Sequence, residues 1–372
     1  MTKKFSIFLT VLFCAFIGGV CVISLLLPDK DFSPLENRYL QKPPKLSLET
    51  LGSGKFMEDA EDYVSDHIAG RDFWVAAKAW SERLSGKKEN NGVYFGAQNT
   101  LINRVKAPDP DKLKEDMGYV DALVGNVSVP VYFGLIPSAA EIWRDRLPAG
   151  APTADEKAII DQLYFSTGAS TIDLHSALTA HSGEDIYYRT DHHWTSLGAY
   201  YGANAIFEAL GMEPIDLADY QKTTVTSQFN GTSFSTSGVR WLPPDAIDTY
   251  VPNEGIKVTS WFKGSPEEGS LYVDSYLDVK DKYSYFLGGN QALCVIETEH
   301  ADAPKVLVVR DSYSDSLAPF LTERFSEIHL FDLRYNLSSI KGYVENNSID
   351  LVIVLYSFAN FTTDTNLFLL GR

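Results

Sequence analysis

Three continuous apolar runs constrain the fold of this chain more than any other feature. They occupy residues 127–136, 305–309 and 351–355. Runs of this length without polar alternation are typical of strands buried on both faces of a parallel sheet. The sequence therefore predicts an α/β fold with a parallel sheet and helices between the strands. The expected helices cover residues 110–124, 154–167, 197–210, 317–325 and 339–346, and shorter strands are expected at 171–174 and 327–331.

A stretch of different composition interrupts this alternation at residues 212–300. It is rich in Ser, Thr and Gly and contains no long helical period, so we interpret it as a β-rich insertion. Its aromatic side chains either form a small core of their own or offer flat faces on which sugar rings stack. They are Trp241, Tyr250, Trp261, Tyr272, Tyr276, Tyr283 and Tyr285.

The N-terminus carries an uncharged run of 23 residues, 5–27, preceded by Lys3 and Lys4. A helix of that length rises about 35 Å, enough to cross the hydrocarbon core of a bilayer. The alternative is a cleaved signal peptide, but the residues before Pro28 lack the small pair that a cleavage site requires. We predict an uncleaved signal anchor in residues 1–27, with its positive end in the cytoplasm and the rest of the chain outside.

The remainder of the chain divides into a linker and one domain. Residues 28–50 contain four prolines and no long apolar period, which is typical of a stalk. We predict a folded domain over residues 51–372, which begins with two helices in residues 51–90 that break near Gly70.

The charge and cysteine content limit the partners and the means of stabilisation. The 32 Lys and Arg residues against 49 Asp and Glu give a net charge of −17, which disfavours a general nucleic-acid binder. Only Cys294 follows the apolar run, so no disulfide within the exported part can stabilise it.

Polar side chains suited to acyl transfer follow three of the expected strands. Asp311 and Ser312 come after the first, Arg334 after the second and Asn360 after the third. Because ligands of open parallel sheets bind beyond the carboxyl ends of the strands, we expect these residues to share one site. The string Thr-Asp-His-His-Trp-Thr at 190–195 adds a base and a carboxylate. A serine nucleophile, its base, an orienting carboxylate and oxyanion donors therefore all have candidates.

Each of these features also has a simpler interpretation. Asp-Ser after a strand often caps a helix, and Asn360 fits a turn. The adjacent His192 and His193 fit a turn or the core, and adjacent side chains diverge, which disfavours a metal site. We predict neither a metal nor a cofactor. A competing serine, Ser233 in the string Gly-Thr-Ser-Phe-Ser, follows a polar segment rather than a buried strand, so Ser312 is preferred.

Taken together, these residues resemble the SGNH hydrolase superfamily and, more closely, the DHHW family, whose alginate-acetylating relatives are SGNH-like O-acetyltransferases. The resemblance covers most of residues 36–362 and implies a three-layer α/β/α fold. Because the histidine string precedes the serine string, the connectivity resembles a circular permutation of the usual order. The matching strings are residues 190–195, KVLVVRDSYS at 305–314, Asp-Leu-Arg-Tyr at 332–335, Phe-Leu-Gly-Gly-Asn at 286–290 and Glu-Asn-Arg at 36–38.

The resemblance implies roles for individual residues. Ser312 matches the nucleophile of the superfamily, and Asp191 and His193 match the Asp-x-His pair of the acetyltransferase relatives. The alternative base is His192. Asn360 matches the oxyanion asparagine. Further oxyanion donors are expected from Arg334 or Gly289, and substrate contacts from Arg189, Trp194, Tyr313, Trp241 and Asn290.

Two positions depart from the superfamily pattern. The glycine that usually precedes Asp-Ser is Arg310 here, and the strand expected to end in an oxyanion glycine ends in Arg334. The second oxyanion donor is therefore the least defined part of the expected site.

On this basis we expect a membrane-anchored, extracytoplasmic O-acyltransferase, and specifically an O-acetyltransferase. It would modify a cell-surface polysaccharide or exopolysaccharide through an acyl-serine intermediate. The resemblance implies a membrane-bound acyl-donor protein of the MBOAT type as partner. Two alternatives stay open: an SGNH-type esterase that deacetylates the same polymer, and a non-catalytic glycan-binding component of the acetylation machinery.

Overall fold

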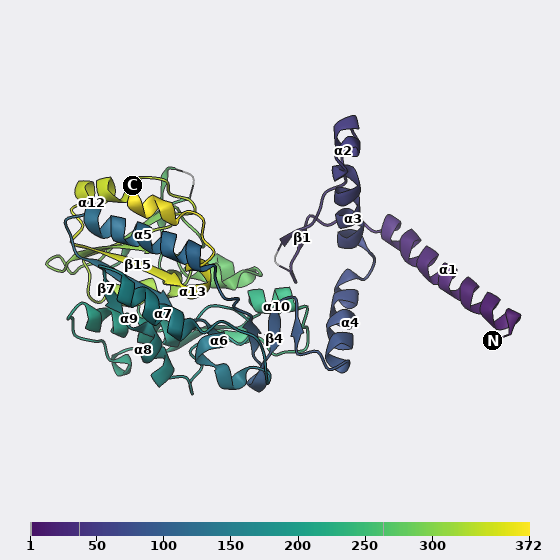
Figure 1. The fold of residues 1–372 in the computed structure, drawn as a ribbon, viewed down its shortest axis with the longest axis horizontal. Helices are drawn as coiled ribbons and strands as arrows, with labels where there is room; N and C mark the ends of the chain where they lie inside the picture. The colour runs from purple at the N-terminus through teal and green to yellow at the C-terminus, as the bar shows by residue number, and fades with distance from the viewer. Residues whose placement is uncertain (1, 37, 263) are drawn as a thin grey trace. The chain divides into compact units, whose positions relative to one another are not determined.

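The computed structural model describes residues 2–36, 38–262 and 264–372 (Figure 1). The described chain forms two compact units. One comprises the N-terminal segment through Asn90 together with Ser235–Trp241, and the other comprises Asn91–Phe234 and Leu242–Arg372. Residues 51–90 therefore group with the N-terminal segment in the first unit.

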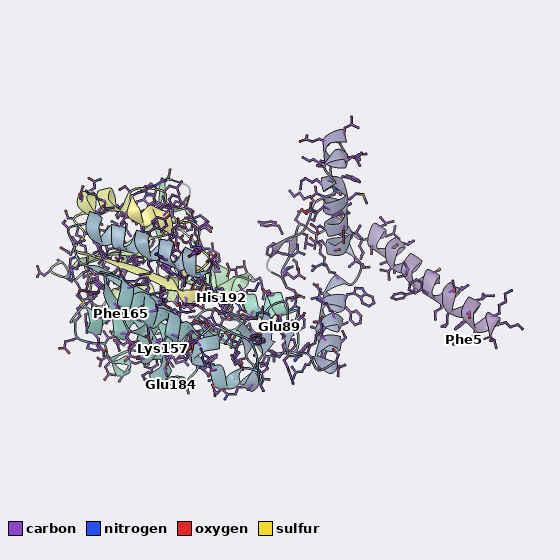
Figure 2. The ribbon with its side chains drawn as sticks, in the orientation of Figure 1. Phe5, Glu89, Lys157, Phe165, Glu184 and His192 are labelled. Atoms are coloured by element: carbon purple, nitrogen blue, oxygen red, sulfur yellow. The ribbon has the colours of Figure 1, made fainter. Side chains whose placement is uncertain are left out.

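The apolar run at the N-terminus forms helix α1 (Lys3–Leu26). None of its 24 residues is buried, its most apolar window has a mean hydropathy of 2.6, and side chains such as Phe5 project outward from it (Figure 2). By length and composition it can cross a membrane, as a membrane anchor or a signal sequence does.

Ion pairs order residues 28–50, which the sequence suggested to be a simple stalk. Arg38 pairs with Glu36 at 2.8 Å and also with Asp66, while Arg71 pairs with Glu36 at 2.5 Å. Asn37 lies outside the described residues. The two outer residues of the Glu-Asn-Arg string thus connect the segment to helices α3 (Lys55–His67) and α4 (Arg71–Leu84). Helix α2 (Leu48–Gly52) precedes α3, and the segment itself holds strands β1 (Phe32–Ser33) and β2 (Arg38–Tyr39).

The larger unit contains the α/β alternation that the sequence predicts. Its longer helices are α5 (Pro110–Asn126), α7 (Glu156–Ser166), α8 (Leu174–Ala180), α9 (Ser196–Ala209), α11 (Ser314–Leu321) and α12 (Ile340–Asn347), with shorter α6 (Ala139–Ile142), α10 (Thr232–Ser237), which runs into the other unit, and α13 (Phe358–Phe361). Its strands are β4 (Val93–Phe95), β5 (Leu101–Asn103), β6 (Val131–Ile136), β7 (Ser170–Ile172), β8 (Thr223–Phe229), β9 (Asp245–Thr249), β10 (Lys257–Trp261), β11 (Pro266–Gly269), β12 (Leu293–Glu297), β13 (Lys305–Arg310), β14 (Glu327–Phe331) and β15 (Leu351–Ser357).

One eight-stranded sheet organises this unit, in the order β11-β10-β12-β14-β13-β15-β6-β7. The five strands from β14 to β7 are parallel, and β12, β10 and β11 extend one edge antiparallel. Helices α5 and α12 lie on one face, and α8 and α9 lie on the other (Figure 1). The predicted three-layer α/β/α fold with a parallel sheet is therefore confirmed.

The centre of the sheet explains the apolar runs. Strand β13 pairs with β14 on one side and with β15 on the other, and its residues Val306, Leu307, Val308 and Val309 are fully buried. Both faces of β13 are covered by helices, which explains why these four successive residues are all apolar. The carboxyl ends of β14, β13 and β15 consequently lie side by side.

The insertion is β-rich, as predicted, but it does not form a sheet of its own throughout. Strands β8 and β9 pair as a separate ribbon, whereas β10 to β12 continue the main sheet. Most of its buried aromatic residues pack into a small core together with Tyr188 and Ile247, and we call this core the aromatic cluster. Its buried members are Tyr188, Phe229, Ile247, Tyr283, Tyr285 and Phe286.

Candidate active site

The Thr-Asp-His-His-Trp-Thr string forms a tight turn. A β-bridge joins Tyr187 to Trp194, and the amide of Tyr188 donates to the carbonyl of His193 at 3.2 Å. The Asp191 carboxylate accepts the amide of His193 at 2.9 Å, which is the local bond that favours aspartate in turns. The turn thus fixes the aspartate and the second histidine relative to each other.

Three of the predicted residues form a continuous hydrogen-bonded chain. The Nδ1 atom of His193 lies 2.6 Å from a carboxylate oxygen of Asp191, and its Nε2 atom lies 2.8 Å from the Oγ of Ser312. Asp191 and His193 are 2% and 5% exposed, whereas Ser312 is only partly buried. An accessible hydroxyl, an imidazole and a buried carboxylate in this order can activate a serine for nucleophilic attack.

The surroundings of Asp191 keep its carboxylate ionised. Burial alone raises the pKa of a carboxyl group, but both adjacent imidazoles, the hydrogen bond to His193 and the amide of Thr232 together hold the pKa of Asp191 well below its usual range. Thr232 donates its amide at 2.6 Å and its hydroxyl at 2.9 Å to the same carboxylate oxygen. A Cβ at Gly231 would lie 2.2 Å from that oxygen, so only glycine fits there.

Sequence reasoning missed Gly231 and Thr232 as part of the site. They lie in the Gly-Thr-Ser-Phe-Ser string, which we considered only as a source of a competing nucleophile. Ser233 in that string is fully buried and its Oγ lies 3.0 Å from the side-chain oxygen of Asn103. The string therefore supports Asp191 and does not present a serine.

His192 makes different contacts from His193. Its Nδ1 atom lies 2.6 Å from the hydroxyl of Thr232 and 3.7 Å from the Asp191 carboxylate. Burial and then the neighbouring His193 lower the pKa of His192 to about 4. Because the contact with the Oγ of Ser312 comes from His193, the geometry favours His193 as the base.

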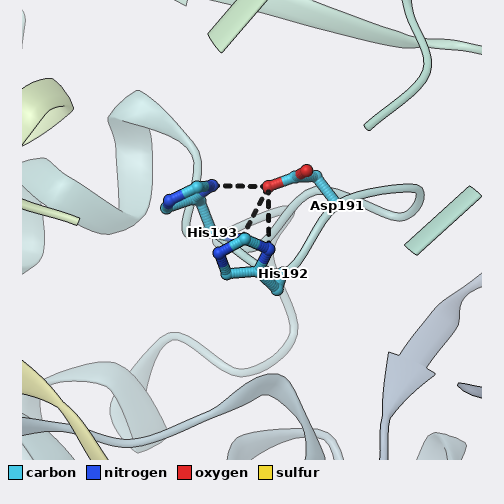
Figure 3. A group of neighbouring side chains, drawn as sticks. All are labelled: Asp191, His192 and His193. Carbon is cyan, nitrogen blue, oxygen red and sulfur yellow. Dashed lines mark hydrogen bonds and ion pairs between the residues drawn. The ribbon is translucent and has the colours of Figure 1, made fainter. Parts of the chain in front are cut away.

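Asp191, His192 and His193 also form a group that could hold a metal ion. One potential ligand atom from each lies within 4.8 Å of the others, and both imidazoles face the same carboxylate oxygen (Figure 3). The atoms are engaged in hydrogen bonds, however, since His192 contacts Thr232 and the Nε2 of His193 contacts Ser312. A metal bound here would compete with the serine for His193.

Asp311 connects the ends of two neighbouring strands. One of its oxygens accepts the amide of Tyr313 at 3.0 Å, and the other accepts the amide and hydroxyl of Ser357 and the side-chain amide of Asn360 at 2.7 Å. This carboxylate therefore fixes the Asn360 side chain next to the turn that carries Ser312.

Arg310 stands where the superfamily has glycine, and its side chain points into the core. It is fully buried, pairs with Asp315 at 2.8 Å and donates to the side chain of Gln291 at 2.9 Å. The departure from the family pattern therefore adds a buried ion pair beneath the Ser312 turn.

The three predicted oxyanion residues are not equivalent in the structure. Asn360 and Arg334 line a cavity of about 270 Å³ together with Asp311, and Gly289 is not among the described residues that line it. Arg334 is bound by the Asp332 carboxylate, which raises its pKa above the usual range. The side-chain amide of Asn360 donates to Asp311 at 2.7 Å, beside the turn that carries Ser312, and its role as an oxyanion donor stays a prediction.

The predicted substrate-contacting residues occupy several environments. Trp194 and Tyr313 are 0% and 3% exposed, which argues against substrate contact. Arg189 pairs with Asp245 at 3.0 Å, and Asn290 is exposed and lies 3.5 Å from Arg334. Trp241 belongs to the other unit, where its ring centroid lies 4.3 Å from that of Trp80.

Comparison with known proteins establishes the family. The model of the DHHW protein family matches residues 122–331, more than half of the chain, so the chain belongs to the DHHW family. A DHHW family protein from Eubacterium siraeum is similar in structure, with 25% identity, a TM-score of 0.68 and coverage of 76% of this chain and 95% of that chain. A search of the curated proteins found no match.

A more distant structure shares the fold. Bacillus cereus PatB1 with a sulfonyl adduct has 21% identity and a TM-score of 0.60, covering 74% of this chain and 96% of that chain. The O-acetyltransferase domain of Pseudomonas putida AlgJ has 15% identity and a TM-score of 0.45, and the match covers 73% of this chain and 93% of that chain. A TM-score below 0.5 does not establish a common fold for this last pair.

Proposed function

We propose that the protein is a serine-dependent O-acyltransferase that acetylates a cell-surface polysaccharide or exopolysaccharide. The observation that carries the proposal is the chain of contacts from Asp191 through His193 to the Oγ of Ser312, with distances of 2.6 and 2.8 Å. Ser312 is also partly exposed, so a substrate can reach its hydroxyl, as a nucleophilic serine requires and a binding protein without catalytic activity does not.

In the first half-reaction, the Oγ of Ser312 attacks the carbonyl carbon of an acyl ester while the Nε2 of His193 takes its proton. The tetrahedral oxyanion accepts hydrogen bonds from the Ser312 amide and the Asn360 side chain. As the carbon–oxygen bond to the donor breaks, His193 returns the proton to the leaving oxygen. The products are acyl-Ser312 and the donor alcohol.

In the second half-reaction, a sugar hydroxyl takes the place of the donor. His193 removes its proton, the sugar oxygen attacks the acyl carbon, and the bond to Ser312 Oγ breaks. The Oγ takes the proton back from His193, so the enzyme returns to its starting state. Asp191 keeps the Nδ1 atom protonated and stabilises the imidazolium in both halves.

The N-terminal helix supports the proposed location and is compatible with the membrane-bound donor that the family resemblance implies. With Lys3 and Lys4 on the cytoplasmic side, α1 would anchor the rest of the chain outside the membrane. The donor partner in this proposal is a membrane-bound acyl carrier of the MBOAT type, and the anchor would keep the serine close to it. The predicted oligosaccharide contacts of Asn290 and Arg189 belong to the same proposal.

The test compares transfer with hydrolysis. The full chain in detergent is incubated with a chromogenic acetyl ester, with and without a short oligosaccharide, beside the Ser312→Ala variant. We expect the oligosaccharide to gain acetyl mass only with the wild-type protein. Serine-dependent acetate release without sugar acetylation would instead favour the esterase, and no activity from folded protein would favour a binding role.

A further inference from the structure

One side chain from the insertion contacts both the base and the nucleophile turn. Tyr283 lies in a 3-10 helix (Lys282–Tyr285). Its ring stacks on the imidazole of His193 with centroids 3.7 Å apart and planes at 8°. Its hydroxyl donates to the carbonyl of Ser312 at 3.0 Å and lies 3.0 Å from the hydroxyl of Ser316.

The contacts of Tyr283 are themselves fixed by packing. The side chain is 6% exposed, and Phe286 and Tyr188 lie against it with ring centroids at 5.6 and 6.4 Å. The hydroxyl oxygen of Ser316 also accepts a hydrogen bond from the indole nitrogen of Trp194 at 3.1 Å. Through Tyr283, the aromatic cluster places a side chain directly against the triad.

We propose that Tyr283 is a positioning residue of the active site, and this inference rests on the acyl transfer proposed above. The stacked ring restricts rotation of the His193 imidazole, so that Nε2 stays directed at the Oγ of Ser312. The ring face also attracts the positive charge that the imidazole carries after it accepts the proton. The hydroxyl fixes the backbone from which the serine projects. Tyr283 takes no proton and forms no bond in the proposed reaction, so it acts through His193 and Ser312.

Two substitutions separate the contributions of the ring and the hydroxyl. Tyr283→Phe keeps the stacked ring and removes the hydroxyl, whereas Tyr283→Leu removes both. The matched control is Tyr285→Leu, because Tyr285 lies in the same 3-10 helix, is 5% exposed and stacks on Tyr272 at 5.3 Å. Loss of either tyrosine ring weakens the aromatic cluster, but only Tyr283 contacts the triad.

The readouts are kcat and KM for a chromogenic acetyl ester and the rate of Ser312 sulfonylation by phenylmethanesulfonyl fluoride. In the latter, the Oγ–sulfur bond forms, fluoride leaves and the hydroxyl proton is lost. Misplacement of a catalytic group by about 1 Å costs about 10²-fold, so we expect Tyr283→Leu to lower kcat and the sulfonylation rate between about 10- and 100-fold. KM should stay within about twofold, and Tyr283→Phe should recover most of the loss because the ring remains.

The outcomes distinguish this inference from the proposed function. If kcat falls equally in Tyr283→Leu and Tyr285→Leu, and each fall follows the decrease in melting temperature, the positioning role is overturned while the function stays intact. If Tyr283→Phe is as impaired as Tyr283→Leu and melts at the wild-type temperature, the role assigned to the stacked ring is overturned, and the function again stays intact. Absence of sulfonylation at Ser312 in the wild-type protein would overturn the function and the positioning role together.

Discussion

The Oγ of Ser312 lies 2.8 Å from the Nε2 of His193, although 119 positions separate the two residues in the chain. The residues that follow them hold the two strings together. The indole of Trp194 donates to the carbonyl of Tyr313 at 2.9 Å, and the hydroxyl of Tyr313 donates to the carbonyl of His192. Trp194 and Tyr313, which we expected at the substrate, thus join the base to the nucleophile from within the core.

Substitution of Gly231 tests the support of Asp191. In Gly231→Ala, the added methyl would meet the Asp191 carboxylate at 2.2 Å, so the carboxylate must move away from His193. We expect kcat for acetyl-ester turnover to fall about 10²-fold. The control is Gly183→Ala, because no atom lies within 4 Å of a Cβ there. Equal activity of the two variants would contradict the described position of Asp191.

Asn360 tests the oxyanion site. Removal of one oxyanion donor typically lowers kcat about 10²- to 10³-fold, and we expect this loss for Asn360→Ala with little change in KM. Thr363 lines the same cavity and is exposed, so Thr363→Ala should remain close to wild type. An equally small loss of kcat in both variants would contradict a role for Asn360 as an oxyanion donor.

The protonation of His192 predicts how stability depends on pH. Its pKa falls from 6.5 to about 4 on folding, so between these values the unfolded chain binds more protons than the folded chain. The neutral, buried His192 therefore favours the folded state fully above pH 6.5, and this contribution to the free energy of unfolding decreases as the pH falls toward 4. Chemical denaturation of His192→Gln from pH 4 to 7 should show a shallower slope than wild type. An unchanged slope would show that His192 titrates alike in both states.

Metal removal tests the role of the Asp191, His192 and His193 group. Because the Nε2 of His193 contacts Ser312, the proposed reaction uses this atom as a base. We expect activity to survive dialysis against EDTA and to fall when Zn²⁺ is added, since the ion would occupy the imidazole. Activity lost on chelation and restored by Zn²⁺ would assign a metal to the group.

The sequence predicted the sheet because local patterns determine it. The buried runs became β6, β13 and β15, and their polar successors meet at one edge, as parallel strands require. The insertion was harder to predict, because the pairing of β12 with β14 joins segments by tertiary contacts that no local pattern encodes.

The same limit applies to the site. The position of Ser312 after an expected strand singled out the serine, and the resemblance to the DHHW family supplied the Asp-x-His pair. Thr232 and Tyr283 reach the triad from 41 positions beyond Asp191 and 29 positions before Ser312, through contacts that depend on how the insertion packs. Arg310 suggested a changed oxyanion site, but it lies buried against Asp315, and burial of a charge depends on a partner that the sequence does not identify.

The most direct measurement traps the acyl-enzyme. The wild-type protein and the Ser312→Ala and His193→Gln variants are mixed briefly with an activated acetyl ester, quenched in acid and analysed by intact mass and peptide mapping. The account predicts one acetyl group on the wild-type chain, located on Ser312, and none on the corresponding peptide of either variant. An acetyl group on another residue, or equal labelling of His193→Gln, would contradict a serine activated by His193.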